Sequence, residues 1–438
     1  MTGAAIVCAD VGSTYTKVAA VDAETGRWYG NATHRTTIDP DVMDGLGAAR
    51  TEVESLLPQG VEVAELRVCS SAGGGLRLGV VGNEPLVTAT AAHRAGLSAG
   101  ARVVSIMAGD FGESDLGELA ETAPDIVLLA GGTDGGDATV LIEHAEILAR
   151  ASAGDERLRV PVVLAGNRDA RDTVAAILAG ADLPVMPVDN VLPRIGQLNP
   201  APARSALREA FLSHVIAGKH LSHRESFAAL VRSATPDTVL SGVETLADGH
   251  GDIPARGDLV VVDVGGATTD VYSVLTPDAE RSGPRREVAG TAWRSRTVEG
   301  DLGMRHTAPG IVTAAADENL LLPGEADPLA AAAARRAAAP GWLPETPDDV
   351  ACDLRLTGLA ITIAMRRHCR GERLGGPGAP LRGGKDLRAV TLVVGSGGVL
   401  RHHGDAALDT VARAVNADTA GGYPLPRNPM MVIDTSYA

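Results

Sequence analysis

Residues 259–271 read LVVVDVGGATTDV, and residues 6–17 read IVCADVGSTYTK. In each stretch an apolar run leads into Asp, one further residue, Gly and small hydroxyl residues, after which a second apolar run begins. This order predicts a tight β-hairpin with a carboxylate at its entrance. Glycine lets the turn backbone approach a ligand closely, and the N–H groups of such a turn can bind phosphate oxygens. We therefore expect two similar hairpins that grip one phosphate tail from opposite sides.

The first hairpin offers a carboxylate, a phosphate-binding turn and a lysine. Asp10 is expected to hold Mg²⁺ through water. Lys17 either neutralises phosphate charge or simply begins the next strand and faces solvent. The turn residues expected to bind the β- and γ-phosphates are Gly12, Ser13 and Thr14. Taken alone, this pattern also fits an ordinary Asp/Gly/Ser turn, and the second hairpin is what favours the functional interpretation.

The second hairpin is the sharper of the two signals. An apolar strand runs directly into Asp263, and an ionised carboxylate at the end of a buried strand requires a partner, such as Mg²⁺ or a phosphate-bound water. The residues expected to bind phosphate here are Gly265, Gly266, Thr268 and Thr269. Asp270 either orients a water molecule or caps the turn, and the turn role is favoured.

A third glycine-rich segment follows a predicted strand and opens a predicted helix. Residues 393–398 read VVGSGG, and flat glycine backbone at such a place can pack against an adenine or ribose face. The predicted contacts are Gly395, Ser396, Gly397 and Gly398. Many strand-to-helix turns contain Gly, so this segment matters because of its position after the second hairpin.

Composition excludes several classes of protein. The chain has 438 residues, a net charge of −16 and a pI near 5.1, which argue against general binding to nucleic acid or to anionic membranes. No apolar run approaches the ~20 residues of a membrane helix, and the N-terminus lacks the basic region of a signal peptide. We therefore expect a cytoplasmic protein. The four cysteines lack CxxC spacing, which is typical of reduced thiols.

The distribution of strand and helix signals predicts the domain organisation. Residues 65–188 alternate between the two, which predicts parallel strands with helices on their faces. Residues 201–248 have a helical, Ala-rich pattern, and the tail from Gly421 has no regular pattern. The predicted domains are residues 1–255, which include an α/β insertion, and residues 256–438.

The order of hairpin, long α/β stretch, hairpin and glycine-rich turn resembles the actin-like ATPase superfamily, which includes sugar kinases, Hsp70 chaperones and hydantoinase-type proteins. The resemblance covers nearly the whole chain. It implies an α/β fold with two actin-like ATPase (ribonuclease H-like) domains and a nucleotide cleft between them. It also implies ATP and Mg²⁺ as ligands, with Asp10 and Asp263 as catalytic, metal-holding residues. The P-loop pattern GxxxxGK[ST] is absent from the sequence.

Four further blocks are similar to one group within that superfamily. They are SSAGGGLR at residues 70–77, LAGGTDGGD at 129–137, AGNRD at 165–169 and RTVEGDLGMR at 296–305. These blocks resemble the glutamate mutase accessory MutL family, which is unrelated to the mismatch-repair protein of the same name. The resemblance implies an ATP-dependent helper whose partners are the subunits of adenosylcobalamin-dependent glutamate mutase, with no nucleic-acid or membrane partner. It leaves the oligomeric state open.

The roles of individual residues in these blocks stay open. Asp134 is the candidate for positioning the attacking water, as an acidic or amide residue between the two phosphate motifs does elsewhere in the superfamily. Asp137 shares that possibility, with a helix N-cap as the alternative. Glu299 and Asp301 face the nucleotide, a partner protein or solvent. The segment 73–75 is a hinge or a partner contact.

The expected function is that of a slow ATPase whose cleft closes on ATP and reopens on ADP, which changes the surface shown to a mutase and helps to eject damaged cobalamin. Three alternatives remain at this point. The chain is otherwise a small-molecule kinase of the same superfamily, a hydantoinase-like amidohydrolase, or a scaffold that binds ATP without turnover.

Overall fold

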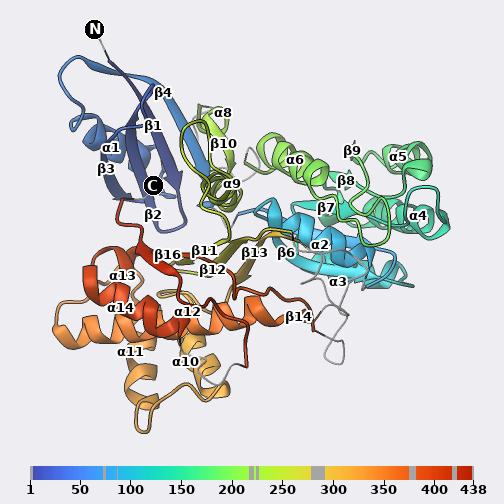
Figure 1. Cartoon of the computed structure of the whole chain (residues 1–438). Coiled ribbons are helices and arrows are strands. Elements are labelled where there is room, and N and C mark those ends of the chain that lie inside the picture. The colour runs from blue at the N-terminus through green and yellow to red at the C-terminus, as the bar shows by residue number, and fades with distance from the viewer. Residues whose placement is uncertain are drawn as a thin grey trace. The chain divides into compact units, whose positions relative to one another are not determined.

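The computed structural model describes residues 3–72, 75–85, 87–216, 221–222, 226–277, 292–373, 381–416 and 422–436 (Figure 1). The chain divides into two compact units, one built mainly from residues up to Leu240 and the other from Ser241–Asp278, Trp293–Arg373 and the residues from Pro380 onward. The domain boundary expected at residue 255 stays a prediction. Gly73 and Gly74, from the expected hinge or partner contact, lie outside the described residues.

The first unit begins with a five-stranded sheet in the order β10-β4-β1-β2-β3. Its strands are β1 (Gly3–Val11), β2 (Tyr15–Asp22), β3 (Trp28–Arg35), β4 (Val61–Ser70) and β10 (Val231–Ala234). β1 and β2 are antiparallel, as are β2 and β3, whereas β4 is parallel to both β1 and β10. The hairpin predicted from residues 6–17 is therefore confirmed.

Helix α1 (Val42–Glu54) shows how sequence pattern produces packing in this unit. Its backbone begins at Asp41, whose side chain accepts a hydrogen bond from the N–H of Met43 and so satisfies one of the free donors of the first turn. The buried side chains Val42, Leu46, Ala49 and Val53 recur at helical spacing and form one apolar face. That face packs against β2 and β3.

Between β4 and β10 the chain forms a second five-stranded sheet, in which all neighbouring strands are parallel. Its order is β6-β5-β7-β8-β9. Its strands are β5 (Arg77–Gly82), β6 (Arg102–Ala108), β7 (Ile126–Leu129), β8 (Val162–Leu164) and β9 (Val185–Pro187), and its helices are α2 (Thr88–Ser98), α3 (Glu113–Glu121), α4 (Thr139–Gly154) and α5 (Arg171–Ala179). Short 3₁₀ turns lie at Glu156–Leu158 and Arg168–Ala170. The predicted alternation of strands and helices is confirmed.

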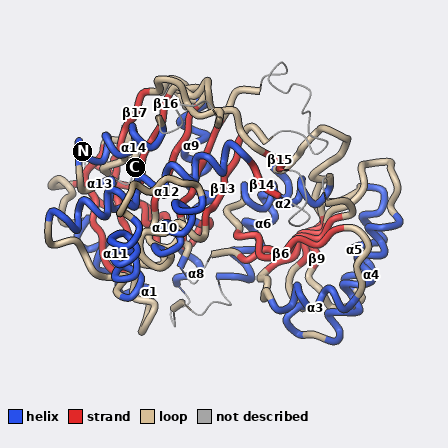
Figure 2. Tube along the Cα trace, turned by 90° about the horizontal axis from the view of Figure 1, so that it is seen from below, coloured by secondary structure: helices blue, strands red, loops and turns tan. Residues whose placement is uncertain are grey.

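One continuous apolar core joins the two sheets of the first unit. It contains Val7 and Val18 from the first sheet together with Leu78, Leu128 and Val163 from the inserted sheet. A separate core of buried residues covers the opposite side of the inserted sheet, where Val81 and Leu129 point. The inserted sheet is thus covered on both faces, as expected for parallel strands, and Figure 2 shows its strands side by side with α4 and α5 next to them.

After the inserted sheet the chain forms several helices and one short strand, β10. The helices are α6 (Ala201–Ala210), a π-helical turn at Phe211–Val215, α8 (Ser226–Leu230) and α9 (Thr235–Asp248). The mostly helical pattern predicted for residues 201–248 is found, but it misses β10, which pairs with β4 through Val231↔Val68 and Ala234↔Ser70. Four residues between two helices have little local strand signal, and pairing with β4 decides their conformation.

The second unit repeats the arrangement of the first sheet, in the order β13-β12-β11-β16-β17. Its strands are β11 (Leu259–Val264), β12 (Thr269–Val274), β13 (Arg294–Glu299), β16 (Leu392–Ser396) and β17 (Met430–Ile433), with a small separate pair, β14 (Gly371–Arg373) and β15 (Leu381–Gly383). Its helices are α10 (Ala308–Asp317), α11 (Ala326–Ala338), α12 (Pro347–Arg370), α13 (Gly398–Arg401) and α14 (Gly404–Val415). The prediction of an irregular tail after Gly421 is wrong, because β17 pairs in parallel with β16.

The topology of the two sheets identifies the fold. Numbered by chain order, each sheet reads 3-2-1-4-5, with strand 2 antiparallel to both of its neighbours and strand 4 parallel to strands 1 and 5. This is the ribonuclease H-like order of the actin-like ATPase superfamily. The fold is therefore α/β with two actin-like ATPase domains, as predicted.

A buried histidine joins α12 to the second sheet. His368 is 1% exposed, and its Nδ1 and Nε2 lie 2.9 Å from the hydroxyls of Thr297 and Ser273 respectively. Burial, with a smaller contribution from the charge of Lys385, lowers the pKa of His368 to about 3. The folded chain therefore holds this imidazole neutral at pH values where an unfolded chain protonates it.

Lowering the pH from about 7 to about 5 is expected to reduce the free energy of unfolding by about 2 kcal/mol through His368 alone. The unfolded imidazole binds a proton below about pH 6.5, whereas the folded one does so only near pH 3, so stability is lost as pH falls. Urea unfolding at both pH values measures this loss, and His368→Gln should show a smaller one. An equal loss in both proteins would contradict the prediction.

Candidate functional site

The carboxylate of Asp10 lies near the carboxyl end of β1, where three different elements contact it. Its Oδ2 is 3.6 Å from Nζ of Lys17, the residue opposite it in the hairpin register. Its Oδ1 accepts a hydrogen bond of 2.6 Å from the hydroxyl of Thr235 and lies 3.8 Å from Sγ of Cys69. Burial raises the pKa of the Cys69 thiol, which keeps it a neutral donor. Lys17 thus faces the carboxylate, and Asp10 remains partly exposed.

The turn of the first hairpin is tight and partly open to solvent. The N–H of Gly12 donates to the carbonyl of Tyr15 at 3.1 Å, and the hydroxyl of Thr36 donates to the carbonyl of Gly12 at 2.8 Å. A Cβ on Gly12 would lie 2.8 Å from the Tyr15 oxygen, so a side chain does not fit there without a shift. Ser13 is exposed and Thr14 half-buried. These two residues are placed where a phosphate could reach them.

The second hairpin carries two aspartates opposite one another with different surroundings. Asp263 is half-buried, whereas Asp270 is buried and forms an ion pair with Arg296 at 2.5 Å. Asp270 also accepts a hydrogen bond of 2.9 Å from the hydroxyl of Thr268. These contacts support the turn role for Asp270. Thr269 is buried, and its hydroxyl donates to the carbonyl of Leu302 at 2.6 Å, so phosphate binding by its side chain stays a prediction.

The loop that follows β13 packs directly on the second turn. The N–H groups of Met304 and Arg305 donate to the carbonyls of Gly265 and Gly266 at 2.9 and 2.8 Å. A Cβ on Gly303 would lie 2.2 Å from the carbonyl carbon of Ala267, so only glycine fits this contact. Backbone atoms set the spacing of this contact, and the block at residues 296–305 therefore supports the turn of the second hairpin.

The third glycine-rich segment lies beside the second hairpin. β16 is parallel to β11, with Ser396 in register with Asp263. Gly397 has φ +119°, and a Cβ there would lie 2.3 Å from the carbonyl oxygen of Val264. The structure therefore brings Gly395, Ser396, Gly397 and Gly398 to the same end of the second sheet as Asp263. Of these four residues, Gly398 is exposed and Ser396 half-buried.

Two acidic residues whose role was open share an arginine. Nη1 of Arg367 lies 2.7 Å from carboxylate oxygens of both Glu299 and Asp301, and its Nη2 lies 2.9 Å from Asp301. These ion pairs connect the end of β13 and the loop after it to α12. A cavity of about 440 Å³ adjoins this group, lined by Thr297, Val298, Glu299, Arg367, Arg370, Gly371 and Leu381. It lies at the edge strand β13, two strands away from Asp263, and is separate from the glycine turns.

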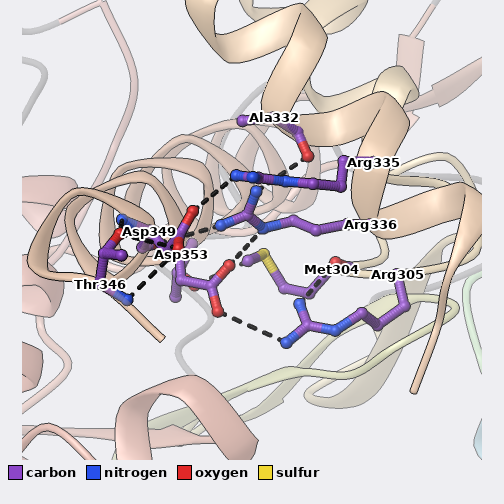
Figure 3. Close-up of polar contacts among 9 residues, drawn as sticks. Met304, Arg305, Ala332, Arg335, Arg336, Thr346, Asp349 and Asp353 are labelled. Atoms are coloured by element: carbon purple, nitrogen blue, oxygen red, sulfur yellow. Dashed lines mark hydrogen bonds and ion pairs between the residues drawn. The ribbon is translucent and has the colours of Figure 1, made fainter. Parts of the chain in front are cut away.

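A buried ion cluster lies behind the same loop (Figure 3). Asp353 of α12 is 1% exposed and binds Arg336 of α11, which is fully buried, and Arg305 at 3.4 Å. Arg335 pairs with Asp349 at 2.6 Å alongside it. Because the N–H of Arg305 also donates to Gly266, the cluster connects α11 and α12 to the second turn.

The two aspartates of the other glycine-rich block belong to the inserted sheet. Asp134 follows β7 and accepts hydrogen bonds of 3.0 Å from the N–H of Arg168 and from Nδ2 of Asn190. Asp137 accepts from the N–H and hydroxyl of Thr139 at the start of α4, and these bonds lower the pKa of Asp137. The N-cap residue of α4 is Ala138, so Asp137 closes the turn just before the helix and is not its N-cap. A catalytic role for Asp134 stays a prediction, since the sheet that carries Asp10 is a different one.

Sequence reasoning missed Thr235, the first residue of α9. The helical pattern of residues 201–248 gave no sign of β10, and without β10 nothing placed Thr235 near Asp10. The signal that could have found it is the order Ala234-Thr235-Pro236-Asp237, a hydroxyl residue followed by Pro and Asp, which is typical of a helix start.

Comparison with known families gives the relationship of the chain. The family described as MutL protein matches residues 6–438. The chain belongs to the MutL family. Protein MutL of Clostridium tetanomorphum is 36% identical to this MutL family member over 436 residues, which are 98% of this chain and 93% of that relative. The resemblance predicted from the four sequence blocks is confirmed.

Solved structures similar to this MutL family member include three with low sequence identity. Nucleotide-free acetone carboxylase, described under ATP-dependent acetone carboxylation, has a TM-score of 0.37 at 13% identity and covers 92% of this chain and 66% of that one. Gluconate kinase from Lactobacillus acidophilus has a TM-score of 0.30 at 11% identity, with coverages of 94% and 84%. ROK hexokinase from Thermus thermophilus has a TM-score of 0.25 at 12% identity, with coverages of 98% and 92%.

The donor set of the two hairpins is compatible with Mg²⁺ bound to a nucleotide. Among the residues that the structure describes, no three His, Cys, Asp or Glu side chains gather as an all-protein metal site requires. Mg²⁺ in nucleotide sites is held instead by one or two carboxylates, water and phosphate oxygens, and the partly exposed Asp10 and Asp263 fit that role. Across the described parts of this MutL family member, none of the helices has the length and apolar character that crossing a membrane requires.

Proposed function

We propose that this MutL family member binds ATP with Mg²⁺ through its two hairpins, hydrolyses it slowly, and serves an adenosylcobalamin-dependent glutamate mutase as an accessory protein. One observation carries the proposal. Asp10 and Asp263 occupy equivalent places at the end of the first strand of two sheets with the same topology, and each is followed by a glycine turn. A carboxylate repeated in this way on both domains supports a Mg²⁺-bound phosphate as the ligand.

Each group in the hairpins has a defined task in this proposal. Asp10 and Asp263 hold hydrated Mg²⁺, which supplies positive charge to the phosphates. The backbone N–H groups around Ser13 and Gly266 donate to phosphate oxygens, and the glycines near Ser396 pack beside the adenosine. Phosphoryl transfer to water needs positioning and charge stabilisation and no covalent step on the protein.

The accessory role rests on nucleotide-dependent shape. Two domains that both contact one triphosphate lose part of their contacts when the γ-phosphate leaves, so ATP and ADP favour different arrangements of the domains. A mutase subunit that binds one of these arrangements more tightly is bound in one nucleotide state and released in the other. Ejection of a damaged cobalamin is the task that such a cycle suits. Support for this partner comes from membership of the MutL family.

The test uses the purified full-length chain and the subunits of glutamate mutase. ATP binding is measured by calorimetry with Mg²⁺ and with EDTA, phosphate release by a continuous assay, and mutase capture on the immobilised chain with ATP, ADP or no nucleotide. We expect Mg²⁺-dependent binding, slow phosphate release and capture that differs between ATP and ADP. Failure to bind ATP would overturn the proposal, and transfer of phosphate to an added sugar or acid faster than to water would favour a kinase.

A further inference from the structure

Thr235, which directly follows β10, places its hydroxyl against the carboxylate of Asp10 in the first hairpin. Thr235 is separated from Asp10 by the whole inserted sheet in the sequence, yet its Oγ1 donates to Asp10 Oδ1 at 2.6 Å. β10 brings it there, since Val231 and Ala234 pair with β4 and β4 pairs with β1. The contact is therefore a product of the sheet topology.

The surroundings of Thr235 keep it in place. The first turn of α9 also carries Asp237, whose side chain is 1% exposed and lies 2.8 Å from Nε of Arg204 and 2.5 Å from Nε of Arg208. These two arginines lie four residues apart, on one face of α6. A buried carboxylate held by two guanidinium groups fixes the start of α9, because moving Asp237 away from the two arginines would leave its buried charge uncompensated.

The two oxygens of Asp10 consequently have different tasks. Oδ1 faces neutral donors, the hydroxyl of Thr235 and the thiol of Cys69, while Oδ2 faces the ammonium group of Lys17 at 3.6 Å. Without the hydroxyl, the carboxylate is free to rotate toward Lys17 and close that ion pair. A carboxylate turned toward lysine is poorly oriented for a hydrated metal ion.

We propose that Thr235 is a positioning residue for the metal-holding Asp10. This inference rests on the proposed function, since it assigns the orientation of Asp10 in the Mg²⁺·ATP complex to one hydrogen bond. Hydrogen-bond partners of metal-ligating groups alter metal affinity or activity by about 10–100-fold when they are removed. We expect an effect in the lower part of that range, because in the proposed site Asp10 holds Mg²⁺ through water and not by direct contact.

The experiment compares Thr235→Val, which has the same shape without the hydroxyl, with Thr235→Ser, which keeps the hydroxyl. ATP turnover is measured while Mg²⁺ is titrated at fixed ATP. Thr235→Val should raise the Mg²⁺ concentration for half-maximal turnover about 10-fold and recover most of its rate at high Mg²⁺, whereas Thr235→Ser should match the wild type. Thr245→Val is the matched control, since Thr245 is an exposed residue of α9 whose hydroxyl donates to the helix carbonyl of Ser241.

The outcomes separate this inference from the proposed function. If the wild-type chain shows Mg²⁺-dependent turnover and Thr235→Val has the same Mg²⁺ dependence, the positioning role is wrong and the proposed function stands. Equal loss in Thr235→Val and Thr235→Ser with a lowered melting temperature would also overturn it, because packing would then explain the effect. If the wild type neither binds nor hydrolyses Mg²⁺·ATP, both are wrong.

Discussion

Replacing Asp263 with Asn is expected to reduce the rate of ATP hydrolysis by about 100- to 1000-fold, and Asp10→Asn should do the same. Loss of one preorganised charge that stabilises a transition state typically has an effect of this size. Asn keeps the shape and the hydrogen-bonding capacity of the side chain but has no negative charge to hold a hydrated Mg²⁺. Phosphate release at saturating ATP and Mg²⁺ measures the loss in each variant.

The control for both variants is Asp409→Asn. Asp409 lies on α14 with a largely exposed side chain, 3.8 Å from Arg413, so removing its charge should leave hydrolysis within about twofold of the wild type. Calorimetric titration with ATP and EDTA distinguishes a lost metal contact from a lost nucleotide site, since binding without Mg²⁺ should survive in the two hairpin variants. If both hairpin variants keep the wild-type rate, the assigned mechanism is wrong.

Asp353→Ala should destabilise the second unit by about 3–5 kcal/mol, which is the typical result of breaking a buried ion pair from one side. Arg336 is fully buried, and Asp353 is its carboxylate partner in the cluster of Figure 3, so the change leaves a guanidinium charge in the interior. Chemical unfolding followed by circular dichroism measures the change in the free energy of unfolding.

A double variant separates charge from shape at this position. Asp353→Leu combined with Arg336→Met removes both buried charges and keeps apolar volume, so it should recover a large part of the stability that Asp353→Ala loses. Asp409→Asn again serves as the exposed control and should change stability by less than about 1 kcal/mol. An Asp353→Ala protein as stable as that control would contradict a structural role for the cluster.

The two hairpins could be predicted because their signal is local. A strand, an Asp, a glycine turn and a second strand lie within about a dozen residues, and period-2 burial together with turn chemistry decides their conformation. The repeated pattern then led to the fold, since both hairpins form the first two strands of sheets with the same order. The third segment, beginning at Gly395, was predicted to follow a strand and to open a helix, and it joins β16 to α13.

Two of the strands that sequence reasoning missed, β10 and β17, are the fifth strands of their sheets. β10 and β17 each have four residues, lie at an edge, and pair only with a strand that is distant in sequence. Local propensity carries little information about such strands, since tertiary pairing decides them. The same limit hid the contacts of the site. Arg367 holds Glu299 and Asp301 from 68 and 66 residues away, and Thr235 reaches Asp10 across 225 residues.

The continuous core beneath the first sheet and the inserted sheet has a mechanical consequence. Leu78 and Leu128 of the insertion pack in the same buried cluster as Val7 and Val18 of the first sheet. Because protein interiors are closely packed, we expect the insertion and the first sheet to move as one body. Binding of another protein to the insertion would therefore also affect β1, the strand that carries Asp10. A protein that binds the insertion would therefore act on packing that the first hairpin shares.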